Sequence, residues 1–182
     1  MKGTVLFVLG VLAMSSATFA QTPEETVERA LAGAPRNMKE AATVIKWKAD
    51  FTYDTLKTGT NKLVCYDRSG EPGQQPFAVQ CTSMANLPRL AQNKKFEAIA
   101  DKTARQAALD AAEKDGTRIK PEFGSVWIAF GGPDREHARS HTTVAVPGAT
   151  AASMGLPDNP RNGGMWIMNA GTSTAHLMTP GS

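Results

Sequence analysis

Short apolar segments separated by turn residues are the feature of this chain that most limits its fold. Residues 124–178 contain the runs GSVWIAFGGPD, HTTVAV and GGMWIMNAGTSTAHLM, and Gly, Pro and Asn separate their apolar parts. Each apolar part is long enough for a strand and too short for an ordinary helix. We therefore predict strands at 125–130, 141–146, 165–168 and 175–178. The first of them lacks polar alternation, so we expect it to be central and covered on both faces.

The N-terminal half carries a second group of strand signals. β-Branched and aromatic residues mark the segments TVIKWKA, FTYDTLK and KLVCYD, and a Gly-Asn turn precedes the third, which predicts a hairpin. Ile45 and Trp47 fall on one face of the first segment, and Val44 falls on the other with Lys46 and Lys48. This alternation predicts a sheet with one solvent-exposed side.

Helical patterns occur at two places. Thr22, Pro23 and Glu25 have the spacing of a capping box with proline at the first helical position, which predicts a short peripheral helix. The longer pattern runs from about residue 95 to 115 and has a stripe of mostly small residues. We expect an α+β fold in a single domain, with an antiparallel or mixed sheet of about five or six strands. One main helix should pack on one face of that sheet.

The first twenty residues have the features of a secretory signal peptide. Lys2 precedes an apolar run of about ten residues, and small residues flank Phe19 at the end. The run is too short for a spanning helix, so we expect a signal peptide at 1–20 and one domain at 21–182 with no membrane span. The protein should then be periplasmic or secreted.

Cys65 and Cys81 are the two cysteines of the chain. In an exported protein, such a pair favours a disulfide, whose loop would contribute roughly 3 kcal/mol of stability in the chain-entropy model. A reactive thiol or a metal ligand is the alternative, although no CxxC spacing supports it. The disulfide would hold the loop at 68–76 by both ends, and this loop is a possible surface for a protein partner.

Charge and motifs argue against several function classes. The chain has 20 basic and 17 acidic residues, whereas nucleic-acid binding needs clustered Lys and Arg. The segment around Ser173 matches G-x-S-x-A, but no helix pattern or downstream acid follows it, as a nucleophile elbow requires. No P-loop, haem motif, HExxH or dinucleotide motif is present. We therefore expect no nucleic-acid partner, no cofactor and no catalysis.

Three residues offer one alternative to a non-catalytic role. His176 and Met178 share a face of the last predicted strand, and His141 begins another strand. If these strands are neighbours, two imidazoles and a thioether could meet, and this ligand mixture suits copper. The alternative function is therefore a small copper- or zinc-dependent enzyme or a metal carrier that uses His141, His176 and Met178.

Several of these features together resemble a family of small exported bacterial proteins without an assigned activity. The resemblance rests on the signal peptide, the spaced cysteine pair, WIAFGG, the His-led strand HTTVAV and the closing AHLM. In that family, proline precedes the leading histidine and methionine follows it, whereas this chain has Ser140 before His141 and Val144 after it. The resemblance implies an exported protein of unknown role. We expect a non-catalytic binding or structural protein of the periplasm or extracellular space.

Overall fold

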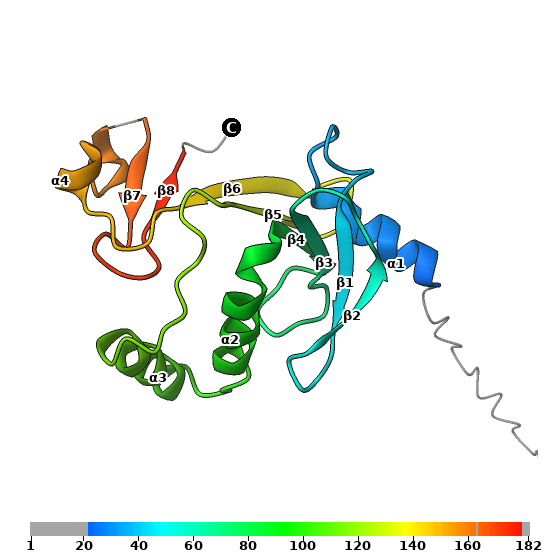
Figure 1. Ribbon diagram of the computed structural model, residues 1–182, viewed down its shortest axis with the longest axis horizontal. Coiled ribbons are helices and arrows are strands. Elements are labelled where there is room, and N and C mark those ends of the chain that lie inside the picture. Colours follow the sequence, from blue (N-terminus) through cyan, green and yellow to red (C-terminus); the bar gives the residue numbers. More distant parts are fainter. Residues whose placement is uncertain (1–21, 163, 180–182) are drawn as a thin grey trace, which may run out of the picture.

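A single eight-stranded sheet forms the centre of the molecule. The computed structural model describes residues 22–162 and 164–179, so the predicted signal peptide lies outside the described residues. The strand order is β2-β1-β3-β4-β5-β6-β8-β7, and Figure 1 shows the sheet running from β1 to the β7 and β8 end. The strands are β1 (Thr43–Trp47), β2 (Tyr53–Lys57), β3 (Leu63–Asp67), β4 (Phe77–Ser83), β5 (Val126–Gly132), β6 (Arg139–Ala145), β7 (Trp166–Met168) and β8 (His176–Met178).

The expected mixed sheet is confirmed, but it is larger than five or six strands. Every neighbouring pair is antiparallel except β1 and β3, which are parallel. Strand β4 was not predicted, and it pairs with both β3 and β5 near the centre. Its buried sequence FAVQCTS mixes apolar and polar residues without a clean alternation, so period alone does not mark it.

The predicted hairpin around Gly59 is wrong. Strand β2 pairs with β1, and β3 pairs with β1 from the other side, so the turn crosses over the start of β1 instead of joining neighbours. A Cβ atom on Gly59 would fall on the backbone of residues 41–43. The glycine is therefore required by this close crossing, which a sequence pattern does not distinguish from a hairpin turn.

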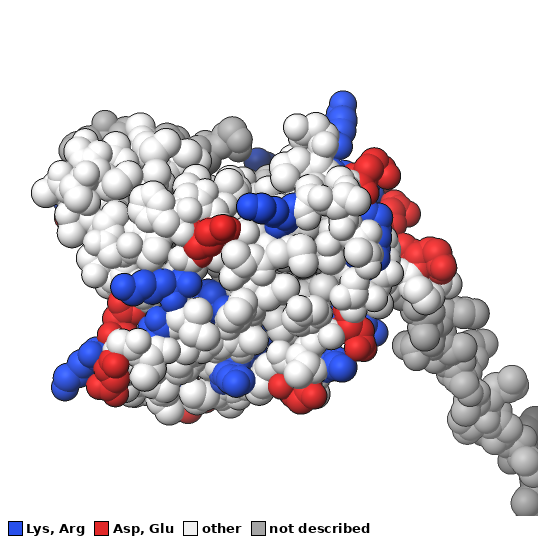
Figure 2. Space-filling view, in the orientation of Figure 1, with Lys and Arg blue, Asp and Glu red and all other residues white. Residues whose placement is uncertain are grey.

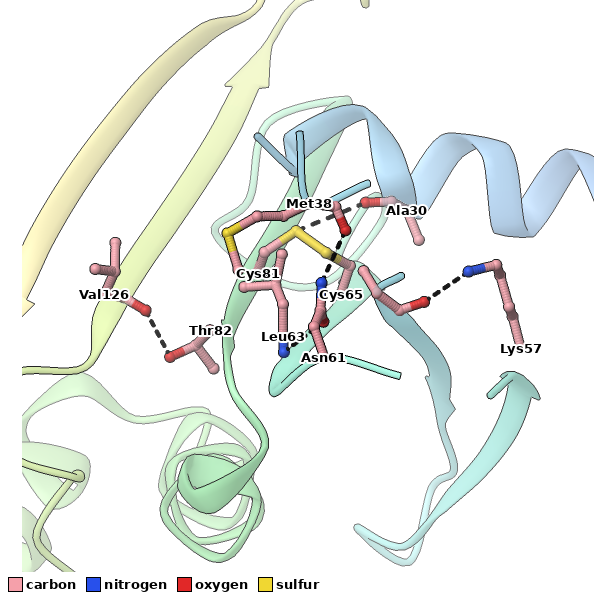
Figure 3. Close-up of a disulfide and its surroundings, with 10 residues drawn as sticks. Ala30, Met38, Lys57, Asn61, Leu63, Cys65, Cys81, Thr82 and Val126 are labelled. Carbon is pink, nitrogen blue, oxygen red and sulfur yellow. Dashed lines mark hydrogen bonds between the residues drawn. A yellow bond between two sulfur atoms is a disulfide. The ribbon is translucent and has the colours of Figure 1, made fainter. Parts of the chain in front are cut away.

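One face of the sheet packs around the disulfide between Cys65 and Cys81, which is confirmed. Helix α1 (Pro23–Ala30) begins at the predicted capping box of Thr22 and Glu25. It covers this face together with Leu31 and Met38, and Figure 3 shows Ala30 and Met38 beside the two sulfur atoms. The expectation of a solvent-exposed side beside β1 is wrong at Val44, which is fully buried in this cluster.

The opposite face of the sheet packs against α2 (Leu87–Glu97). Leu87 and Leu90 of this helix contact a cluster that contains Ile45, Val64 and Tyr66. Helix α2 covers the end of this face that includes β1 and β3, and Figure 1 shows α3 (Lys102–Lys114) lying farther from the sheet.

The predicted main helix at about 95–115 is wrong because two helices share that range. Helix α2 begins before it, with Pro88 in its first turn, and ends at Glu97. Asp101 then accepts a hydrogen bond from the Ala104 N–H at 2.7 Å and caps α3. An N-cap aspartate satisfies a free backbone N–H at the start of a helix. A second helix therefore begins at this position, although the sequence pattern from 95 to 115 is continuous. Only Ala112 of α3 is buried.

The C-terminal part of the chain completes the sheet. Strand β5 is central as predicted, but Val126 and Ala129 are exposed, so it is not covered along both faces. Helix α4 (Ala151–Met154) packs with Ile167, Ala175 and Leu177 on one side of β7 and β8. Among residues 22–162 and 164–179, no helix has the length and apolar character needed to cross a membrane.

Candidate functional site

A hollow of about 320 Å³ lies on the α2 face of the sheet, above β5, β6 and β8. We call it the sheet-face cavity. Ala129, Thr143 and Ala145 come from neighbouring strands, and Arg89 and Asn93 come from α2. Its other lining residues are Gln80, Pro121, Trp127, His141, Thr174, Ala175 and His176. A volume of this size lies at the lower end of small-molecule sites, which begin at about 300 Å³.

The sheet-face cavity continues into a second hollow of about 240 Å³. The two share Gln80, Ala129 and His141, and the second adds Arg68 and Arg139 to the lining. Among the described residues, no aspartate or glutamate lines either hollow. Charges of both signs are interspersed on the molecular face shown in Figure 2. Of the two arginines that the second hollow adds, Arg139 has no ion pair among the described residues, whereas Arg68 pairs with two carboxylates.

Arg89 is the most buried charged residue of the cavity, with 4% of its surface exposed. Its Nη1 donates to the Ile119 carbonyl and, at 3.3 Å, to Ser173 Oγ. Within the described chain, no carboxylate lies within ion-pair distance of Arg89. Burial and the positive charge of Arg118 lower the pKa of Arg89 to about 10, although the nearby Glu113 carboxylate acts in the opposite direction. The guanidinium thus remains a cation at neutral pH, with part of its hydration removed.

Two amide side chains in the lining are turned so that they can donate. Asn93 Oδ1 accepts a hydrogen bond from Arg118 Nη2 at 2.6 Å. Gln80 Oε1 accepts from Tyr66 Oη at 2.6 Å and from Arg68 Nη1 at 3.3 Å. Because the carbonyl end of each amide is occupied, the NH₂ end is the one left to serve a ligand.

Ser173, the serine of the G-x-S-x-A match, has a structural partner. Its N–H and Oγ–H donate to the two carboxylate oxygens of Glu113 at 2.5 and 2.6 Å. Burial raises the pKa of Glu113, but these bonds and the charges of Arg89 and Arg118 outweigh it and hold the pKa below its usual value. Ser173 is 5% exposed, and it lies in the loop between β7 and β8, so a strand and not a helix comes directly after it. The serine holds this loop on α3.

The structure places His141 and His176 around the same cavity, but not side by side. Ala129 pairs with His141, whereas Ala145 pairs with His176. His141 and the partner of His176, Ala145, are four positions apart on β6, which corresponds to about 13 Å along a strand. Among the described residues, no group of three or more His, Cys, Asp or Glu side chains could hold a metal ion.

His176 and Met178 lie together on β8, as the alternation predicted. Their cross-strand partners on β7 are Met168 and Trp166, respectively. His176 Nδ1 lies 2.7 Å from the Thr174 carbonyl oxygen. A carbonyl oxygen can only accept, so Nδ1 carries the proton and Nε2 has the free lone pair.

The loop at 68–76 is tied to α2 by charge pairs. Arg68 contacts Glu71 and Glu97 at 2.8 and 2.7 Å, and Lys94 contacts Glu71 at 2.5 Å.

A larger hollow of about 610 Å³ lies elsewhere, beside α1, where Glu28 and Arg135 already pair. Its lining carries charges of both signs, so it does not select a ligand by charge.

Comparisons of this chain with protein-family models, curated proteins and solved structures gave no match. The site is therefore interpreted from its own residues. Sequence reasoning missed Arg89, Asn93 and Gln80 as site residues. None of them belongs to a motif, and they reach the cavity only through the packing of α2 and the pairing of β4.

Proposed function

We propose that this chain is an exported, non-catalytic binding protein that holds a small organic anion in the sheet-face cavity. The observation that carries the proposal is a nearly buried arginine, Arg89, in a lining without acidic residues among those described. Bringing a carboxylate to this guanidinium would offset the desolvation that the cation already experiences. A planar carboxylate also matches the paired donors of arginine.

The remaining lining supports an organic anion over a simple inorganic one. Asn93 and Gln80 offer amide donors, and Trp127, Ala129 and Ala145 offer apolar surface. Sites for small organic ligands combine a few placed polar groups with a mainly apolar and aromatic lining. A carboxylate attached to a small apolar body would use both parts of this cavity.

Export is supported by two features of the chain. The signal-like segment at 1–20 directs the chain out of the cytoplasm. The disulfide between Cys65 and Cys81 is of the kind that persists in an oxidising compartment. A periplasmic or secreted location follows from these two features as part of the proposal.

The test uses benzoate, succinate and citrate as probes and the fluorescence of Trp127 as the signal. At least one carboxylate should bind and shift this fluorescence, while the neutral analogue benzamide should not. Arg89→Met should weaken binding at least about tenfold because truncating a buried charged contact costs more than 1.4 kcal/mol. Arg89→Lys should keep part of the affinity, since the charge remains but the paired donors are lost.

Arg105→Met is the matched control because Arg105 lies on α3 and lines neither hollow. The affinity of this variant for the carboxylate probes should equal that of the unmodified protein. If no carboxylate binds with a Kd below about 10 mM, or if benzamide binds as well as benzoate, the anion-binding function is wrong. Thermal unfolding of each variant checks that the fold has been kept.

A further inference from the structure

We propose that the β7–β8 hairpin carries a copper(I) site formed by Met168, His176 and Met178. This site is separate from anion binding and does not rest on that function. It differs from the set considered from sequence, because Met168 takes the place of His141. Of the three proposed ligands, only His176 also lines the sheet-face cavity.

The strand register brings the three side chains to one face. Met168 lies directly opposite His176 in the antiparallel β7–β8 pair, and directly opposed side chains have Cβ atoms about 5 Å apart. Met178 follows His176 by two residues on β8, so it projects from the same face about 7 Å further along the strand. Two thioethers and one imidazole are therefore neighbours.

The imidazole is already oriented as a ligand. The Nδ1–H of His176 donates to the Thr174 carbonyl at 2.7 Å, which leaves the Nε2 lone pair for a metal ion. Metal-binding histidines commonly donate their second nitrogen to a backbone carbonyl or carboxylate in this way, and the contact fixes the ring orientation. Little rearrangement of His176 is needed for binding.

The hairpin is anchored on one face and open on the other. Ile167 is fully buried with Leu177 and Met154 in the cluster beside α4. On the ligand face, Met168 is 44% exposed, and His176 and Met178 are half-buried. Exposing a large apolar side chain opposite a histidine has no packing benefit, whereas it gives a metal ion access to the thioether.

The donor set selects the metal. Thioethers are soft, neutral ligands that favour copper(I), while zinc prefers thiolate, imidazole or carboxylate ligands and calcium requires oxygen ligands. Trp166, which lies opposite Met178, places an aromatic ring beside the same site. Since a nearby copper ion quenches indole fluorescence, Trp166 provides a spectroscopic signal for occupancy.

The test is an anaerobic titration of the purified protein with copper(I), in competition with the chelator bicinchoninate. One equivalent should bind, and zinc should neither bind at this site nor displace the copper. Met168→Leu, Met178→Leu and His176→Asn should each weaken the affinity at least tenfold. Leucine preserves the volume of methionine, and asparagine keeps a donor near the Nδ1 position while removing Nε2.

Met165→Leu is the matched control, because Met165 is 41% exposed and precedes β7 by one residue, outside the shared ligand face. It should bind copper(I) as the unmodified protein does, and copper should not quench the remaining tryptophans in Trp166→Phe. Arg89→Met should also keep copper binding, so failure of the anion site and failure of the copper site can be told apart. The proposal is overturned if copper(I) is not bound by the folded protein. It is also overturned if the three ligand variants bind as tightly as Met165→Leu.

Discussion

Ser173 donates two hydrogen bonds to the carboxylate of Glu113, which lies 60 residues earlier in the chain. The bonds join α3 to the loop between β7 and β8, and Arg89 donates to the same serine hydroxyl. This loop also contains Thr174, whose carbonyl orients the ring of His176. The contact between Glu113 and Ser173 thus positions one wall of the sheet-face cavity.

Glu113→Gln is expected to destabilise the protein by about 1 kcal/mol, because the neutral amide has only one oxygen to accept from the two Ser173 donors. The expected destabilisation is small because the Glu113 carboxylate is partly open to solvent, which weakens its interactions. Urea unfolding at neutral pH measures the difference in free energy. Glu136→Gln, in the exposed loop after β5, is the control and should leave the midpoint unchanged.

The contact between Glu113 and Ser173 also predicts that the stability of the protein depends on pH. The folded-state pKa of Glu113 is lowered from its usual value of 4.5, so its contribution to stability is present above that value. The contribution is lost as the pH falls through the lower folded-state pKa. The stability difference between the unmodified protein and Glu113→Gln should therefore shrink between pH 5 and acidic conditions. A difference that stays constant over this range would contradict the role given to the carboxylate.

Replacing both Cys65 and Cys81 with alanine should lower the free energy of unfolding by about 3 kcal/mol. The two residues are separated by 16 positions in sequence and lie opposite each other on β3 and β4. Their loss frees the loop of the unfolded chain and also removes buried sulfur atoms from the α1 face. Denaturant unfolding of the oxidised protein and the double variant measures the loss. Equal midpoints would show that the disulfide does not contribute to stability.

Asn86→Ala should cost about 2 to 3 kcal/mol, because this side chain is fully buried and forms three hydrogen bonds. Its amide donates to Thr82 and Ser125, and its carbonyl accepts from the Glu122 N–H. It therefore joins α2, β4 and the segment before β5. Asn37→Ala, at an exposed position, is the control and should change stability by less than about 0.5 kcal/mol.

Local signals predicted the parts of the fold that depend on neighbours in sequence. The capping box at Thr22 and the strand segments around Ile45 and Val64 are present in the structure. Predictions about how these segments are connected and paired were wrong. The turn at Gly59 looks like a hairpin turn, and only the crossing over β1 shows otherwise. The break between α2 and α3 was hidden because Asp101 fits a continuous helical pattern as well as it fits a cap.

The candidate sites divide in the same way. Alternation placed His176 and Met178 on one face because both belong to the same strand. Met168 could not be added to them, since a sequence does not give the register of β7 against β8. Arg89 could not be identified either, because an arginine in a short helix is ordinarily exposed. Its burial depends on how α2 packs on the sheet and on the loop that contains Ser173.

The sequence by itself determined most of the segments that form strands, with β4 as the exception, together with the start of α1 and the residues that can pair as a disulfide. Strands and helix starts depend on side-chain period and capping chemistry, which act over a few neighbouring residues. The possible disulfide depends only on the number of cysteines in the chain. The tertiary structure alone decided which strands are neighbours, which arginine is buried and which methionine lies opposite His176. Those relationships depend on contacts between residues far apart in the chain, and many different pairings satisfy the same local preferences.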